Sequence, residues 1–554
     1  MGSEGGRRRV AVAAAVAVVV TLAIAGLALG SRHRTGRAVA GATTAPGAAV
    51  PPPWHRGTPA SQAPAGSAAW SVAVRTENAR PGSRDWKVPG SRGRTPGLDA
   101  YAGQVSVLPG QPVTLYVRAA PAGPVRVEAL RVGYYGGAGG RRVWSGIVRA
   151  GAQPKPKTVS TAIPGSGGLA DSRMVVAPWH PTTVLQTTGW PEGDYLIRLD
   201  AGKASRLVPL TVRSADARGR VLLVAGAMTW QAYNAWGGRS LYTGPGGFAG
   251  RSYAVSFDRP YDDFSGAGRF PPFDAPVVRL AEQDGLPLAW ETDDDLAQHP
   301  ELAEGAAEIV IGGHAEYWTA PMWEAVRGAV ARGTNLAVLG ANTAYWRVRL
   351  AGQVNGVDRV LVGTKDASLD PLARSDPSGA TARFRDAPHP RAEEELTGMR
   401  YDCFPADAPW TVTSPDWWGY AGTGVRDGEQ LPALVGPESD RVYPAPDRPR
   451  PMTVVGYSRF DCGPGRPSAQ TGVYWVAPSG AGVFAAGTMR WACAMGETCA
   501  KVPDARVRRI VQQVSTTVLT AFATPRAGTS RPATDTVSRY WLPSRSTGTA
   551  ASSD

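Results

Sequence analysis

The sequence predicts an immunoglobulin-like β-sandwich followed by an α/β domain, with a transmembrane helix at the N-terminus. Short runs of alternating polar and apolar residues fill positions 68–215, which is typical of antiparallel strands. Continuous apolar runs alternate with helical patterns over positions 218–525, which indicates a parallel sheet covered by helices. A nearly unbroken apolar run at positions 10–29 has the length that a helix needs to cross a bilayer.

The N-terminal segment, residues 1–30, is predicted to be an uncleaved signal anchor. Arg7, Arg8 and Arg9 precede its apolar run, which fits a cytoplasmic N-terminus. The run is longer than the core of an ordinary signal peptide, and cleavage near 28–31 followed by secretion is the alternative. We therefore expect a single-pass protein of the cell membrane with the bulk of the chain outside the cytoplasm.

Low-complexity sequence flanks the predicted folded part. Residues 31–67 are rich in Ala, Gly, Pro, Thr and Ser, a composition that cannot bury a core and predicts a flexible linker. Residues 526–554 have the same character and predict a disordered tail.

The net charge of +13 does not indicate a nucleic-acid-binding protein. Much of the surplus of arginine lies near the N-terminus, and no basic helix is interleaved with aromatic residues. We therefore expect no nucleic-acid partner.

Four cysteines all lie in the last third of the chain, and no two have the C-x-x-C spacing of a zinc site. An even number of cysteines in an exported chain predicts two disulfides, with three possible pairings. The preferred pairing joins Cys403 to Cys462 and Cys493 to Cys499.

Polar side chains follow two of the predicted parallel strands. His314 and Glu316 come after the apolar run 309–311, and Asn342 comes after the run 336–339. In an open parallel sheet, ligands bind beyond the carboxyl ends of the strands. These three side chains are therefore candidates for the chemistry.

Residues 229–261, after the first parallel strand, are predicted to form a long loop dense in Tyr, Trp and Gly. Long loops of this kind are uncommon inside compact domains and are often functional. The chain has no G-x-S-x-G, H-E-x-x-H or Walker motif, and two of its six histidines, His33 and His55, lie in the predicted linker. If the chain is an enzyme, the remaining source of a strong nucleophile is a metal held by oxygen ligands, which suit a hard ion such as Fe(III).

Four segments resemble the large (beta) subunit of N,N-dimethylformamidase and its actinobacterial relatives: WQAYNAWGGRSLY (230–242), SFDRPY (256–261), GGHAEYW (312–318) and NLAVLGANTAYWRVR (335–349). The resemblance is good over roughly 130–350. It implies a β-sandwich and an amidotransferase-like (flavodoxin-like) α/β domain. It also implies hydrolysis of a small amide with one Fe³⁺ ion held by two tyrosines and one glutamate.

The resemblance assigns roles to individual residues. It implies Tyr233 as the first tyrosine ligand and Tyr242 as the second, with Tyr253 or Tyr261 as alternatives. The glutamate ligand corresponds to Glu316.

It further implies that His314 assists proton transfer and that Asn342 orients the substrate. A small subunit or a second copy of the chain is a possible partner. No carboxylate late in the chain matches a catalytic one.

Other interpretations remain open. Glu316 could merely cap the helix that starts near Thr319. The acidic run 293–295 resembles a metal cluster, but its place after Thr292 favours helix capping. The chain could also be a cell-envelope protein that binds a peptide or glycan without catalysis, or a metal-independent hydrolase that uses Glu316 with an aspartate of 293–295.

Overall fold

The computed structural model describes residues 67–541, apart from 88–96, 161, 164, 355–356, 387, 445–447, 497, 500 and 502. Helix α1 (Ser67–Asn78) opens this part of the chain, where the sequence predicts strands. Val74 of α1 is buried against the apolar residues of the helices and strands described below.

The predicted fold class is corrected to a mixed α/β fold with many β-sheets. No helix among the described residues is long and apolar enough to cross a membrane. The longest, α9 (Ala505–Phe522), carries arginine and glutamine residues, whereas a spanning helix is predominantly apolar over about 20 residues. The predicted transmembrane helix (10–29) and most of the predicted linker lie outside the described residues, so the structure does not support a fold class that includes a spanning helix.

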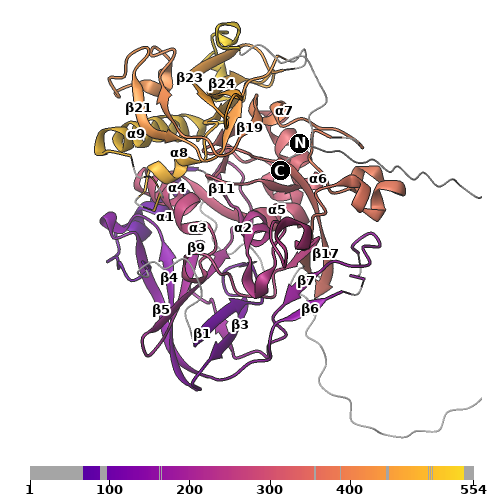
Figure 1. The fold of residues 1–554 in the computed structure, drawn as a ribbon. Coiled ribbons are helices and arrows are strands. Elements are labelled where there is room, and N and C mark those ends of the chain that lie inside the picture. Colours follow the sequence, from indigo (N-terminus) through magenta and orange to yellow (C-terminus); the bar gives the residue numbers. More distant parts are fainter. Residues whose placement is uncertain are drawn as a thin grey trace, which may run out of the picture. The chain divides into compact units, whose positions relative to one another are not determined.

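The first part of the chain forms two antiparallel-rich sheets (Figure 1). Buried apolar residues of both sheets form one core. The smaller has the order β1 (Leu98–Ala102), β3 (Pro112–Ala119), β8 (Thr183–Gln186). The larger has the order β2 (Ser106–Val107), β10 (Ala204–Val212), β9 (Gly193–Ala201), β4 (Gly123–Val132), β5 (Gly140–Ala150). Every second residue of β3 is buried, as the alternating pattern predicts.

A seven-stranded sheet forms the centre of the following region. Its order is β13 (Leu288–Thr292), β11 (Val221–Ala225), β14 (Glu308–Ile311), β16 (Asn335–Val338), β25 (Gly482–Ala485), β24 (Pro467–Val476), β23 (Met452–Asp461). The first five strands are parallel, and β24 and β23 are antiparallel to their neighbours. The last strand in sequence, β25, therefore lies inside the sheet.

Helices cover both faces of this sheet. Leu222 and Val224 pack with α2 (Ala227–Tyr233), α5 (Asp293–Gln298) and α6 (Ala320–Arg332). Their neighbours Val221 and Leu223 face the other way, towards α4 (Ala275–Gln283) and α9. A strand buried on both faces explains the continuous apolar runs in the sequence.

Smaller elements complete the structure. A four-stranded sheet has the order β12 (Ala254–Ser256), β18 (Val357–Val362), β17 (Trp346–Val354), β15 (Tyr317–Thr319). The two-stranded pairs are β6 (Lys157–Val159) with β7 (Met174–Val176), β19 (Arg400–Cys403) with β22 (Ser439–Arg441), and β20 (Ala408–Thr411) with β21 (Gln430–Val435). The short helices are α3 (Phe270–Phe273), α7 (Glu394–Thr397) and α8 (Arg490–Ala494).

The predicted disordered tail is wrong as far as residue 541. Short 3-10 turns, Ala527–Thr529 and Val537–Tyr540, follow α9, and the side chain of Val537 is fully buried. The backbone N–H of Thr536 donates to Met452 of strand β23. This segment is held by a few buried side chains and by hydrogen bonds to the edge strand β23. Its low-complexity composition gives no sign of these contacts. Residues 542–554 lie outside the described part.

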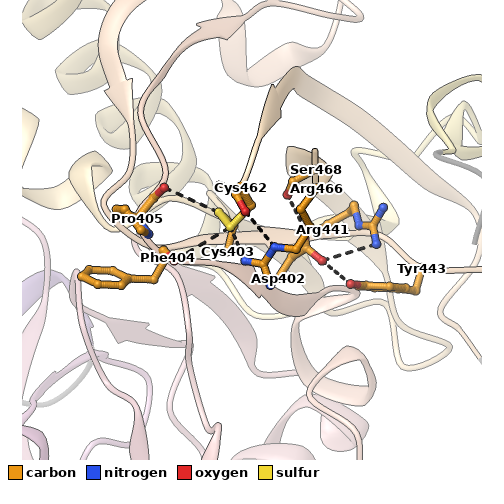
Figure 2. Close-up of a disulfide and its surroundings, with 9 residues drawn as sticks. All are labelled: Asp402, Cys403, Phe404, Pro405, Arg441, Tyr443, Cys462, Arg466 and Ser468. Atoms are coloured by element: carbon orange, nitrogen blue, oxygen red, sulfur yellow. Dashed lines mark hydrogen bonds and ion pairs between the residues drawn. A yellow bond between two sulfur atoms is a disulfide. The ribbon is translucent and has the colours of Figure 1, made fainter. Parts of the chain in front are cut away.

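Both predicted disulfides are confirmed. Cys403 and Cys462 are 59 residues apart in sequence, with Cα atoms 5.8 Å apart, and Cys493 pairs with Cys499, six residues later. Figure 2 shows the first, which ties the end of β19 to the residue after β23. Beside it, Asp402 accepts hydrogen bonds from Tyr443 and Ser468, so polar contacts reinforce the covalent link.

Loss of the two disulfides is expected to have unequal effects. Closing a longer loop removes more entropy from the unfolded chain. The double variant Cys403→Ala/Cys462→Ala should lose about 4 kcal/mol of unfolding free energy, and Cys493→Ala/Cys499→Ala about 2 kcal/mol. Urea unfolding of the two variants measures this difference, and equal losses would contradict the loop-length argument.

Candidate active site

The candidate site lies at the carboxyl ends of β11, β14 and β16. Helix α2 leaves β11 and ends at Tyr233, His314 follows β14, and Asn342 follows β16. Thr229, in α2, accepts hydrogen bonds from the backbone N–H groups of Glu316 (3.0 Å) and Tyr317 (3.3 Å). This contact fixes the loop after β14 against α2, so segments far apart in sequence converge here.

Tyr233, Tyr242 and Glu316 lie together. The Tyr242 hydroxyl donates to Glu316 Oε1 over 2.5 Å, and the ring centroids of Tyr233 and Tyr242 are 4.6 Å apart. The alternatives lie elsewhere: Tyr253 packs beside two arginines, and Tyr261 packs against Trp230. Tyr242 is therefore the second tyrosine that the geometry favours.

His314 lies between Glu316 and a carboxylate that the sequence did not reveal, Glu438. Its Nε2 atom is 3.3 Å from Glu438 Oε2 and 3.6 Å from Glu316 Oε2. All three side chains are buried. Glu438 stands between a Gly-Pro turn and the short strand β22, in a region of irregular pattern, and an acidic residue after such a turn is a weak signal in sequence.

Asn342 holds Glu438 in place. Its side-chain Nδ2 donates to Glu438 Oε2 over 2.8 Å, and its backbone N–H donates to Asp440 Oδ1 over 2.8 Å. Asn342 has a φ of 57°, a left-handed conformation that asparagine tolerates better than most residues. Its Oδ1 is buried without a hydrogen-bond partner among the described residues. The side chain therefore keeps one acceptor available.

The pKa values of the two glutamates at the site are shifted in opposite directions. Burial, with the nearby charge of Glu438, raises the pKa of Glu316. Burial also acts to raise the pKa of Glu438, but His314 and the Asn342 amide outweigh it, so that pKa is lowered. Burial and the charge of Glu316 raise the pKa of both Tyr233 and Tyr242. Glu438 is thus the more acidic of the two carboxyl groups, and burial disfavours ionisation of the two phenols.

Lys365 is a second residue that the sequence did not reveal. Its Nζ lies 2.8 Å from the ring centroid of Tyr242 and 4.9 Å from that of Trp346. Trp346 Nε1 donates to the Tyr242 hydroxyl over 3.2 Å. A cation on one side and an indole N–H on the other hold the Tyr242 ring towards Glu316.

A family model described as "N,N-dimethylformamidase beta subunit-like, C-terminal" matches residues 126–502. The chain belongs to this family. No curated protein matches the chain. Membership in the N,N-dimethylformamidase beta subunit-like family makes the chain hydrolase-like, and all residues of the candidate site fall inside the matched segment.

The donor set of this family member fits a hard cation. Among the described residues, no group of three or more His, Cys, Asp or Glu side chains is arranged to hold a metal ion. Two phenols and one carboxylate meet at this site instead, and Glu316 Oε2 is buried without a hydrogen-bond partner in the described part of the chain. Oxygen donors of this kind suit a hard ion.

The acidic run 293–295 caps a helix, as its place after Thr292 predicts. Thr292 Oγ1 accepts a hydrogen bond from the N–H of Asp295, and Asp295 Oδ2 accepts one from the N–H of Thr292. Asp293 Oδ1 accepts from the N–H of Met228 at the start of α2. The run is therefore a helix cap, and within the described part of the chain it belongs to no group of His, Cys, Asp or Glu side chains that could hold a metal ion. The bond to Met228 attaches α5 to the helix that carries Tyr233.

The stability of the protein is expected to fall as pH rises towards neutrality. Burial, with the nearby charge of Asp295, raises the pKa of Asp294 from 3.8 to about 7. The folded state holds this proton more tightly than the unfolded state, so the stabilisation is complete below about pH 4 and is lost as pH rises through 7. Between about pH 5 and about pH 8, wild type should lose roughly 2 kcal/mol relative to Asp294→Asn.

Urea unfolding at both pH values measures this loss. Asp427→Asn, which changes an exposed aspartate, is the matched control and should follow wild type. Parallel pH profiles for wild type and Asp294→Asn would contradict the assignment.

A groove of about 420 Å³ opens at a different place, between the N-terminus of α6 and strand β17. Its lining includes Thr319, Arg347 and Arg349 but no residue of the candidate site. Arg347 donates to three backbone carbonyls and Arg349 is paired with Asp370, so these arginines hold neighbouring loops.

Proposed function

We propose that the chain is a metal-dependent amidohydrolase that cleaves the C–N bond of a small amide. The observation that carries the proposal is the convergence of Tyr233, Tyr242 and Glu316, with the Tyr242 hydroxyl bonded to the carboxylate. Beside them stands a second carboxylate, Glu438, that contacts His314 and Asn342. We assign the first three residues to the ligand set and Glu438 as the proton acceptor.

Tyr233, Tyr242 and Glu316 would hold one Fe³⁺ ion. When bound, such an ion supplies Lewis acidity that polarises a carbonyl and lowers the pKa of water. The raised pKa values of the two phenols mean that ionising them depends on a nearby cation. Binding is therefore expected to release protons.

The remaining residues manage the substrate and the proton. Glu438, whose pKa is lowered and whose Oε2 lies 3.3 Å from His314 Nε2, would accept the proton of the attacking water. His314 would hold the acceptor carboxylate, and Glu438 would pass the proton that it has taken from water to the leaving amine. Asn342 orients Glu438 with its amide N–H and offers its unpaired Oδ1 to the substrate.

The two disulfides support a location outside the reducing cytoplasm, because such bonds persist in oxidising compartments. The substrate is then an amide that is present outside the cytoplasm or that diffuses to the protein there.

Metal analysis of protein produced with ample iron tests the proposal. We expect about one iron per chain, visible absorption from tyrosinate–Fe(III) charge transfer, and amide hydrolysis that is lost on chelation. Tyr233→Phe and Tyr242→Phe should each change the absorption. A colourless, metal-free protein that binds a peptide or glycan without cleaving amides would favour the non-catalytic alternative.

A further inference from the structure

Arg269 contacts two residues of the candidate site, Tyr233 and His314. Its Cζ lies 3.6 Å from the ring centroid of Tyr233, and its Nη1 lies 3.3 Å from His314 Nδ1. It precedes the short helix α3, whose Phe273 packs edge-on against the His314 ring. On the far side, Arg269 Nε is 3.7 Å from Asp263.

The chemistry of the guanidinium decides how the histidine is protonated. A guanidinium has only N–H donors and accepts no hydrogen bond. The Nδ1 atom of His314 must therefore be the acceptor, and a proton on Nδ1 would point at a cation. A neutral imidazole whose Nδ1 accepts carries its hydrogen on Nε2. That Nε2 faces Glu438 and Glu316, both of which are acceptors when ionised.

We propose that Arg269 is a positioning residue that fixes His314 in the Nε2–H tautomer. In this form the Nε2–H of His314 lies 3.3 Å from Glu438 Oε2 and 3.6 Å from Glu316 Oε2, measured from Nε2, and Nε2 has no free lone pair with which to take the proton of the attacking water. The proton of the attacking water then goes to Glu438. The tautomer can be measured whether or not the protein is an enzyme. Its role in catalysis rests on the proposed function, amide hydrolysis.

Nitrogen-15 NMR of the full-length chain with labelled histidine reads the tautomer directly. Iron, where bound, is replaced by diamagnetic Ga(III), and the His314 signals are assigned by their absence in His314→Gln. Wild type should show a protonated, pyrrole-type Nε2 and an unprotonated, pyridine-type Nδ1. In Arg269→Met, which has no donor, both tautomers should be populated and amide hydrolysis should drop about 10- to 100-fold.

Two further variants separate tautomer control from general damage. Arg269→Lys keeps a donor and a charge and should restore the wild-type tautomer at least in part. Asp263→Asn removes the other partner of Arg269 and should leave the tautomer unchanged.

A proton on Nδ1 in wild type would overturn the proposal, and this result needs no variant to fold. An unchanged tautomer in folded Arg269→Met would overturn it as well. A correct tautomer without amide hydrolysis would instead overturn the proposed function alone.

Discussion

Replacing Glu316 by glutamine is expected to abolish iron binding and to lower amide hydrolysis by more than about 100-fold. The amide is the same size and can still accept the hydrogen bond from Tyr242, so the fold should survive. It lacks the negative charge that a trivalent ion requires. Removing a residue that only supports a metal ligand already costs about 10- to 100-fold, and loss of the ligand should cost more. Metal content, visible absorption and hydrolysis are measured on the same preparation.

The matched control for this change is Glu304→Gln, which replaces an exposed glutamate of the same region and should keep iron, colour and activity. Iron stoichiometry that survives in Glu316→Gln would remove Glu316 from the ligand set.

Replacing Glu438 by glutamine is expected to separate metal binding from catalysis. Glu438 contacts His314 and Asn342, and neither contact involves a phenol oxygen. Glu438→Gln should therefore retain iron and its visible band. Because glutamine accepts no proton at neutral pH, hydrolysis should fall by about 10² to 10⁴, the usual contribution of a general base.

The control here is Glu395→Gln, another exposed glutamate, which should behave as wild type. Loss of iron in Glu438→Gln would show that the carboxylate belongs to the ligand set, and unchanged hydrolysis would remove it from the reaction.

The sequence predicts the part of the site that follows from strand order. His314 and Asn342 come directly after buried parallel strands, and such strands end at one edge of a sheet. Glu316 follows His314 by two residues, so it was found by the same rule. Of the three possible pairings of the four cysteines, the preferred one is confirmed.

Glu438 and Lys365 could not be found this way, because tertiary contacts alone bring them to the site. Glu438 is placed by the pairing of β22 with β19, by the bond from the Met489 N–H to its carbonyl, and by Asn342. Lys365 is in the loop after β18, with a φ of 65°. No periodicity marks either position.

The place of β25 within the seven-stranded sheet bears on how the protein is made. This strand, Gly482–Ala485, inserts between β16 and β24, although the ribosome produces it after every other strand of that sheet. Until it emerges, a nascent chain holds two incomplete sheets with unpaired edges, which invite aggregation. Premature termination before β25 would therefore yield neither a folded sheet nor the contacts that secure Glu438, so the site can form only after β25 has been made.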